Sequence, residues 1–437
     1  MEKNEEYQAW KKERKIFRWV ATIAILFYGL ESQLTTLSIV YYMMDRYHIT
    51  KDQVSVYYSI AQSLFAGVQM FSSLVLGRYV DHTRNIRKIL IIVMAISSLC
   101  NLVYTLPLPI WIVVGTRSLM GVTECLQSAV LGELRRVYNE DKEELISVLN
   151  WYEISCQIGR NFGGILLLCA SLVSFYIGQW KLDRLNFNNL LLSMACFTLF
   201  LFSIFKVKNA SRRLDEIRSK YRVVGKKRAS STEQKPLMEW YDFVQFDIVL
   251  MLVATSILRY VTMATIAYTT LLTTTVYAWK ANNLFAMFFV TNIIAMVSLT
   301  LLAKWYVVKG AKRAFYLFIL ALVAGAVLLI SFMLTKAGLL DTFTKQLIFF
   351  GMMKIGKSIC LYFTNTSGSF LLFSLVSPEN SSSIAGFKSF FNVSMKCLSY
   401  LTAFKAAYLP EYASPPVAIF IFICAYMLLY RRGNFLK

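Results

Sequence analysis

The chain has few of the residues from which enzymes build catalytic and metal sites. Only 2 of its 437 residues are histidine, His48 and His82, and no G-x-S-x-G or P-loop pattern occurs. Its 8 cysteines form no C-x-x-C pair, and no carboxylate cluster has metal-ligand spacing. We therefore expect no metal, no cofactor, no disulfide framework and no enzymatic activity.

Charge is also scarce, and it is mostly of one sign. Only 16% of the residues are charged and 57% are hydrophobic, while 46 lysines and arginines stand against 25 acidic residues, a net charge of +21. A basic chain often binds nucleic acid, but here apolar runs long enough to cross a bilayer separate the basic residues. This composition predicts a membrane protein with no nucleic-acid partner.

Twelve apolar segments, with boundaries uncertain by about four residues, account for most of the chain. The polar stretch 207–242 separates six from six. We expect an all-α membrane protein with two six-helix bundles: a cytosolic leader at 1–18, a bundle at 19–206, a basic cytosolic linker at 207–242, a second bundle at 243–431 and a cytosolic tail at 432–437. The segments cover residues 19–44, 53–76, 88–106, 109–133, 146–175, 188–206, 243–278, 281–303, 314–335, 345–376, 383–408 and 415–430.

The basic residues between the segments predict the orientation. With the N-terminus inside, 31 lysines and arginines lie on the cytosolic side, next to the anionic inner leaflet, and 7 lie in the outer loops. The first apolar run, Trp19 to Met44, is too long for the core of a signal peptide. We expect a monomeric multi-pass membrane protein with both termini in the cytosol.

The loop between the second and third segments resembles a known signature. Its sequence, GRYVDHTRNIRK, is similar to the G-x-x-x-D-R-x-G-R-R loop of the major facilitator superfamily, although one Arg and the second Gly of that pattern are replaced. The resemblance implies the twelve-helix fold of that superfamily and a gating loop. In that loop Gly77 would permit close helix packing and Asp81 would cap or ion-pair a neighbouring helix end. Arg84 and Arg87 would lie at the anionic leaflet.

The first 210 residues or so are similar to a narrower group, the lysosomal ceroid-lipofuscinosis branch and its SPX-associated relatives. That resemblance implies an endolysosomal membrane protein linked to anion movement. The matching motifs are Arg18-Trp19, Gly77-x-x-x-Asp81, Asn101-Leu-Val-Tyr104, Arg117-Ser-Leu-Met-Gly121, Ile154-Ser-Cys-Gln-Ile-Gly159 and Gly163-Gly164.

Eight cations interrupt the apolar segments. A cation at the centre of a membrane helix costs roughly 2.5–3.5 kcal/mol unless it faces a partner or a wet cavity, so this many suggest a bound anion. Lys388 and Lys405 lie near segment ends and are expected to extend to the interface. The eight are Arg117, Arg160, Arg259, Lys354, Lys357, Lys388, Lys396 and Lys405.

In the superfamily architecture, segments 1, 4, 7 and 10 line the central cavity, and each of them carries a charge near mid-membrane in this chain. Glu31 is the one mid-depth carboxylate of segment 1. We expect it to be a proton-coupling or ion-pair switch, because a buried carboxylate can exchange a cation for a proton. The expected substrate contacts are Arg117, Arg259, Lys354, Lys357 and the neutral Asn365.

Two acid–base pairs are spaced seven residues apart and so share a helix face, Arg117 with Glu124 and Glu153 with Arg160. Each pair either neutralises itself or takes part in ion-pair exchange. For Glu153 and Arg160 we favour a structural network, because the nearby glycines, among them Gly159, indicate close helix packing.

The sequence therefore predicts a secondary-active transporter that moves a small anionic solute by alternating access. Proton-coupled and uncoupled mechanisms both fit. Two alternatives remain at this stage: an anion channel along the same basic pathway, and a non-transporting receptor or scaffold that binds its partners through the linker.

Overall fold

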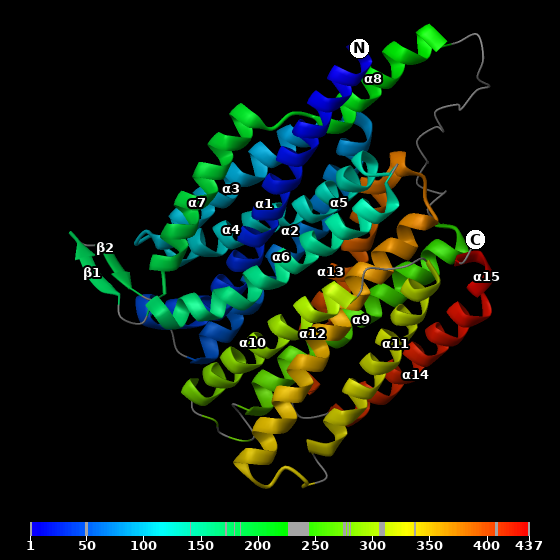
Figure 1. Ribbon diagram of the computed structural model, residues 1–437. Helices are drawn as coiled ribbons and strands as arrows, with labels where there is room; N and C mark the ends of the chain where they lie inside the picture. The colour runs from blue at the N-terminus through cyan, green and yellow to red at the C-terminus, as the bar shows by residue number, and fades with distance from the viewer. Residues whose placement is uncertain are drawn as a thin grey trace. The chain divides into compact units, whose positions relative to one another are not determined.

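The structure of the protein is a computed structural model, and almost all of its regular structure is α-helical (Figure 1). The chain divides into two compact units. Unit 1 consists of Met1–Glu239 and Val376–Phe387, and unit 2 of Trp240–Leu375 and Lys388–Lys437. The structure describes residues 2–48, 51–139, 141–170, 173–178, 180–183, 185–225, 244–273, 277, 279, 281–305, 311–335, 338–406 and 410–435.

Unit 1 is formed by the first six predicted segments, together with two elements that the sequence did not predict. The fourth segment is broken at its centre into α4, a turn of 3-10 helix and α5. The elements are α1 (Glu2–Tyr47), α2 (Lys51–Thr83), α3 (Ile86–Thr105), α4 (Ile110–Met120), η1 (Gly121–Glu124), α5 (Cys125–Val137), α6 (Lys142–Cys169), β1 (Ser174–Ile177), β2 (Trp180–Asp183), α7 (Phe187–Lys206) and α8 (Ala210–Gly225).

Unit 2 is formed by the last six predicted segments. The stretch Val376–Phe387, which includes η6 and the first residues of α13, packs with unit 1 instead. The elements of this part of the chain are α9 (Phe246–Leu271), α10 (Ala281–Trp305), α11 (Ala311–Ser331), η5 (Phe332–Thr335), α12 (Phe343–Ser374), η6 (Pro378–Asn380), α13 (Ser381–Ala406), α14 (Pro410–Tyr430) and α15 (Arg432–Phe435).

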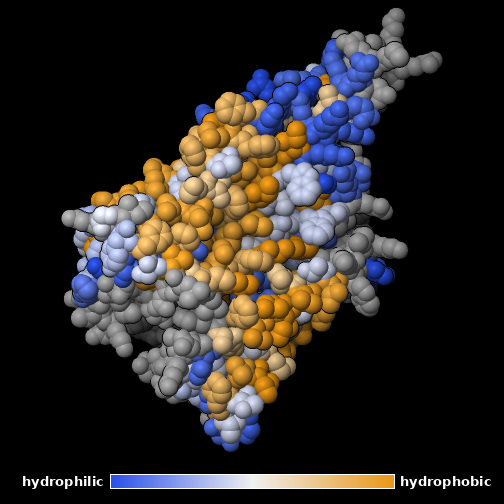
Figure 2. All heavy atoms as spheres, turned by 60° about the vertical axis from the view of Figure 1, so that its left-hand side comes forward, coloured by the Kyte–Doolittle hydropathy of each residue, from blue (hydrophilic) through white to orange (hydrophobic). Residues whose placement is uncertain are grey.

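The predicted all-α membrane fold is confirmed. Large apolar side chains are exposed along the helices, and Figure 2 shows them covering the flanks while hydrophilic residues gather at the helix ends. Such a surface suits lipid and not water. Within the described residues, six stretches are long and apolar enough to cross a membrane by length and composition: Ile60–Thr83, Ile86–Thr105, Phe187–Lys220, Phe246–Ile266, Lys312–Thr335 and Phe343–Ser374.

The leader and the start of the linker are more ordered than expected. Residues 2–18 are not a separate leader but the first turns of α1, and they lie beside α8, which is formed from the predicted linker (Figure 1). Trp10 is 1% exposed, and its indole Nε1 donates to the Ala210 carbonyl at 2.9 Å. Glu13 accepts hydrogen bonds from Lys208, at 2.8 Å, and from Arg213. The remainder of the linker lies outside the described residues.

A short β-hairpin replaces the expected loop between α6 and α7. Strands β1 and β2 pair antiparallel, and Gly178 at their turn has a φ of 63°, which glycine adopts without strain. Trp180 Nε1 donates to the Thr105 carbonyl at 2.6 Å, and Arg46 donates to the Lys181 carbonyl at 2.5 Å. These bonds fix the hairpin to the ends of α1 and α3.

Glycines bring α1 and α6 into backbone contact. A Cβ atom at Gly29 would collide with the Cys156 carbonyl oxygen, and one at Gly159 would collide with the Leu26 carbonyl oxygen. At Gly163 a Cβ atom would press on the Gln33 side chain at 2.8 Å. The close packing predicted for Gly159 is therefore confirmed, and it uses the small-residue contacts typical of membrane helices.

We predict that Gly159→Ala destabilises the protein by about 1–3 kcal/mol, because its methyl group must push two helix backbones apart. The matched control is Gly115→Ala, also within a helix, where a Cβ atom meets nothing within 4 Å. That change should be neutral or slightly stabilising. Thermal unfolding of the two purified variants is the measurement, and equal midpoints would contradict the close α1–α6 contact.

Candidate functional site

A buried ion pair lies at the centre of unit 1. Arg117 Nη1 donates to Glu31 Oε1 at 2.6 Å, and both side chains are 2% exposed. The Arg117 guanidinium also lies 4.0 Å from the centroid of the Phe65 ring, and Thr35 Oγ1 donates to the same carboxylate oxygen at 3.1 Å. The pair therefore neutralises the charge that the sequence assigned to substrate binding at Arg117.

Local structure positions Arg117. It lies in the last turn of α4, where the helix dipole favours a cation. The 3-10 turn η1 follows, and Gly121 at its start lies so close to α2 that a Cβ atom there would collide with the Phe65 carbonyl oxygen. The break in the helix brings the end of α4 against α2, and the guanidinium over Phe65.

The structure gives other contacts for the remaining acid–base residues predicted in unit 1. Glu153 is buried and accepts a hydrogen bond from Gln157 at 2.9 Å, on its own helix α6. Arg160 is half-buried, and its guanidinium lies 5.9 Å from the Tyr28 ring of α1. The Glu124 side chain lies outside the described residues.

Unit 2 holds the predicted basic residues of helices α9 and α12. Lys354 is 9% exposed, and its ammonium lies 3.5 Å from the centroid of the Phe288 ring of α10. In the part of the chain that the structure describes, no carboxylate lies within ion-pair distance of it. Arg259 on α9, and Lys357 and Asn365 on α12, are half-buried.

Lys388 corrects one expectation. It was predicted to extend to the membrane interface, but it is 8% exposed, and its ammonium donates to Ser369 Oγ of α12 at 2.6 Å. Lys388 therefore adds to the buried cations of unit 2. The side chain of Lys405, predicted to behave in the same way, lies outside the described residues.

The charge of unit 2 is one-sided at membrane depth. No aspartate or glutamate occurs in the sequence between Asp247 and Asp341, between Asp341 and Glu379, or between Glu379 and Glu411. Asp247 is paired with Arg431 at 2.8 Å, and Asp341 with Lys345 at 2.7 Å, both near helix ends. Away from the helix ends, the apolar segments of unit 2 thus carry only cations.

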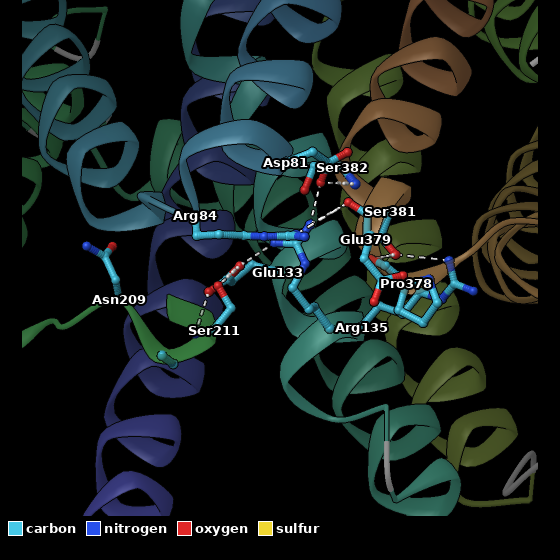
Figure 3. A network of polar contacts seen from close by, with 12 residues as sticks. Asp81, Arg84, Glu133, Arg135, Asn209, Ser211, Pro378, Glu379, Ser381 and Ser382 are labelled. Carbon is cyan, nitrogen blue, oxygen red and sulfur yellow. Dashed lines mark hydrogen bonds and ion pairs between the residues drawn. The ribbon is translucent and has the colours of Figure 1, made fainter. Parts of the chain in front are cut away.

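A second polar centre holds the N-terminus of α13 (Figure 3). The first amides of a helix have no partner within it, and here Asp81 accepts hydrogen bonds from the amides of Ser382, at 3.1 Å, and Ser383, at 2.6 Å. Asp81 also forms an ion pair with Arg136. Gly77, one turn earlier, lies so close to Ser382 that no Cβ atom fits. We call this group of contacts, together with those of Arg135 and Glu133 below, the α13 latch.

Arg136 connects the latch to a second helix end. Its Nη1 donates to Glu133 Oε2 at 2.9 Å, and Glu133 accepts from the Ser211 amide at 3.1 Å and from the Ser211 hydroxyl at 2.9 Å, in the first turn of α8 (Figure 3). Glu133 is fully buried. One arginine therefore joins the carboxylates at the N-termini of α13 and α8.

Arg135 binds the same segment from the other side. It donates to Ser381 Oγ at 2.9 Å and to the Val376 carbonyl at 2.6 Å. Burial lowers the pKa of Arg135 to about 10, because removal from water disfavours the charged form, so it remains protonated at neutral pH. Sequence reasoning missed Glu133, Arg135 and Arg136, although charges in an E-L-R-R run at the end of an apolar segment were a usable signal.

The comparison with known proteins decides the family. The family model of the Major Facilitator Superfamily matches residues 21–401. The chain belongs to this superfamily. It is therefore a membrane transporter and not an enzyme.

A solved superfamily structure has the same fold. The proton:xylose symporter XylE, bound to 6-bromo-6-deoxy-D-glucose, aligns with a TM-score of 0.68 over 96% of each chain, at 11% sequence identity. At that identity the likeness shows the fold alone. No curated protein matches the sequence.

The superfamily loop signature explains a strained residue. The second glycine of that signature falls at Arg84, which follows the end of α2 with a φ of 56°, in the left-handed region that glycine adopts freely. A non-glycine residue costs roughly 1–2 kcal/mol there. Arg84 Nη1 donates to the Glu379 carbonyl at 3.3 Å, within the latch, and burial lowers its pKa. Arg87 instead donates to the Ile204 carbonyl at 2.5 Å.

We predict that Asp81→Ala releases the start of α13, because it removes the helix cap and leaves Arg136 without that partner. Hydrogen exchange at the amides of Ser382 and Ser383 should become at least tenfold faster, equivalent to about 1.4 kcal/mol. The control is Asp341→Ala, which removes an exposed acid paired with Lys345. Unchanged protection of both amides would contradict the capping role.

Proposed function

We propose that the protein is a secondary-active transporter for a small anionic solute, with Lys354 at the binding site. The observation that carries this proposal is a buried lysine in unit 2, in a set of apolar segments whose one carboxylate, Asp247, lies at a helix end and is paired with Arg431. Burying an uncompensated cation costs several kcal/mol, and an anionic substrate would offset that cost each time it binds.

The proposed site is centred on α12. Lys354 and Lys357 lie three residues apart and therefore on one helix face. Arg259 of α9 and the amide of Asn365 are assigned to the same substrate, as a second charge and a neutral donor. The aromatic ring of Phe288, 3.5 Å from the Lys354 ammonium, stabilises the cation when the substrate is absent.

Arg117 has a different role in this proposal from the one its position in the sequence suggests. Its salt bridge with Glu31 compensates both charges inside unit 1, so we assign the pair to proton coupling. Protonation of Glu31 would break the ion pair and release Arg117, and substrate binding would be linked to that change. The name of XylE as a proton:xylose symporter supports proton coupling in this fold, but the substrate proposed here is charged.

Alternating access would then depend on the α13 latch. Its hydrogen bonds between Asp81 and the start of α13 would form in one state and break in the other. On the branch resemblance of the first 210 residues we propose an endolysosomal membrane as the location. On the 31-to-7 distribution of basic residues we propose that both termini are cytosolic.

Flux into proteoliposomes tests the substrate class. The probes are chloride, inorganic phosphate, succinate and neutral xylose, each at two internal pH values. We predict saturable uptake of at least one anion and not of xylose, and at least a tenfold loss in Lys354→Gln. The matched control is Lys345→Gln, which changes an exposed lysine at the start of the same helix and should transport normally.

Three results would contradict this proposal. Uptake of xylose alone would contradict an anionic substrate. Equal activity of the two lysine variants would contradict a role of Lys354 in substrate binding. A flux that rises with concentration without saturating would favour the channel.

Glu31→Gln tests the coupling. A glutamine keeps the shape of the side chain but cannot be protonated and deprotonated as a carboxylate can. Uptake driven by a pH gradient should therefore fall at least tenfold, while exchange of labelled for unlabelled substrate continues. Equal loss of both activities, with normal folded yield, would contradict a specific role in coupling.

A further inference from the structure

A line of buried hydroxyl side chains follows one face of α1. Starting from Glu31, the next members are Thr35, Ser38 and Tyr42, spaced four, three and four residues apart, which places them on the same side of the helix. Thr35, Ser38 and Tyr42 are each 1% exposed. Hydroxyl groups in a membrane interior are costly unless they have partners, so a row of them on one helix face needs an explanation.

Contacts connect some of the members of this line to each other and to α3. Thr35 Oγ1 donates to Glu31 Oε1 at 3.1 Å. Ser38 Oγ and the phenol oxygen of Tyr104, on α3, are 3.2 Å apart and share a hydrogen bond. The Tyr104 ring stacks on Tyr42 with centroids 4.7 Å apart. We call these residues, together with Tyr47 below, the hydroxyl column.

The column ends at the surface of unit 1 that carries the β-hairpin. The Tyr42 ring lies edge-on to that of Tyr47, the last residue of α1, with centroids 6.1 Å apart, and Tyr47 is partly exposed. The Tyr42 phenol donates to the Leu106 carbonyl at 3.5 Å, and the Tyr47 phenol donates to the Leu108 carbonyl. Arg46, the preceding residue, is bonded to the hairpin at the Lys181 carbonyl. From Glu31 to Tyr47 the helix rises about 24 Å, which is more than half the thickness of the hydrocarbon core of a bilayer.

The groups that face Glu31 come from several helices. Arg117 of α4 is its ion-pair partner, and Cys100 of α3 and Cys196 of α7 are close enough to interact with its charge. Arg160 of α6 lies over Tyr28, one turn earlier on α1. The carboxylate is thus enclosed by protein on all these sides, and a proton needs a defined route to reach it.

We propose that the hydroxyl column is the route by which protons pass between Glu31 and the hairpin side of unit 1, a proposal that rests on the proton coupling proposed above. Each hydroxyl can accept a proton on a lone pair while donating its own, so a proton entering at Tyr47 is relayed and a different one arrives at Glu31. Thr35 and Ser38 are adjacent on one helix face, about 5–6 Å apart at Cβ, and a single water would span that step. The Tyr42 phenol has no direct bond to Tyr47 or Tyr104 in the described residues, so the relay needs a water at each of these two steps as well.

The relay leaves no net change in the column. A proton bound at Tyr47 passes by way of Tyr42, Tyr104 and Ser38, and Thr35 transfers the last one to Glu31 Oε1. The carboxylate becomes a neutral acid, and the Arg117 guanidinium keeps its proton and its positive charge. Reversal of the same steps returns the proton.

The test needs no knowledge of the substrate. A pH jump on the purified full chain is followed by time-resolved infrared absorption of the protonated carboxyl, and the band of Glu31 is the one missing in Glu31→Gln. We expect Tyr104→Phe to slow the appearance of that band at least tenfold. Because Tyr104 has no contact with Glu31 of its own, the pH midpoint of the band should not change.

Two further variants complete the experiment. Thr35→Val, which keeps the side-chain shape, should slow the band as much as Tyr104→Phe. The controls are Tyr152→Phe and Thr105→Val, which remove a buried phenol on α6 and a buried hydroxyl bonded to its own helix α3. Both should titrate at the wild-type rate.

The outcomes separate the two proposals. A wild-type rate in Tyr104→Phe and Thr35→Val, with the Glu31 band present, overturns the column and leaves the coupling at Glu31 intact. Absence of any Glu31 band in the wild-type protein overturns both. Slowing in the controls as well as in the column variants overturns the specific route.

Discussion

The cost of placing charge in a bilayer governs this structure. In unit 1 that cost is met inside the protein, because Glu31 and Arg117 neutralise each other at 2.6 Å with 2% of each side chain exposed. In unit 2 it is not met in this way: away from the helix ends the apolar segments carry several cations and no carboxylate, and Lys354 is buried against an aromatic ring. The proposed anionic substrate would supply the missing charge.

The same constraint shapes the α13 latch. Asp81 and Glu133 are buried carboxylates, and each accepts hydrogen bonds from the first amides of a helix while Arg136 holds both. Removal of one member would leave its partners charged and buried, which costs much more than the bonds themselves contribute. The start of α13 and the start of α8 are therefore held by one network, so displacement of one helix end would disturb the hydrogen bonds of the other.

The sequence predicted the architecture well because hydropathy and basic loops depend on local composition. The ion pair could also be predicted from the sequence, because Glu31 and Arg117 both lie at mid-depth in segments that the superfamily architecture brings together. Asp81 as a helix cap followed from the loop signature. Contacts that depend on the packing of distant segments were missed: Glu133 with Ser211, Trp10 with Ala210, and the burial of a lysine near a segment end.

The α1–α8 contact shows why the termini were the weakest part of the prediction. Polar residues without an apolar period do not reveal whether they form a helix. Here the start of α1 and α8 stabilise each other through Trp10, bonded to Ala210, and Glu13, bonded to Arg213. The β-hairpin was missed for a similar reason. Its strands are four residues each, too short for an alternation of apolar and polar residues to distinguish them from a loop. Hydrogen bonds to the ends of α1 and α3, which the sequence does not reveal, hold the hairpin in place.

Direct binding tests most simply whether Lys354 holds the substrate's negative charge, as proposed. Thermal unfolding of the purified protein would be measured with chloride, phosphate, succinate and xylose, since a ligand at 100 times its Kd stabilises the folded state by about 2.7 kcal/mol. We predict that at least one anion raises the unfolding midpoint of the wild-type protein and loses that effect in Lys354→Gln. An equal shift in both proteins, or a shift with xylose alone, would contradict it.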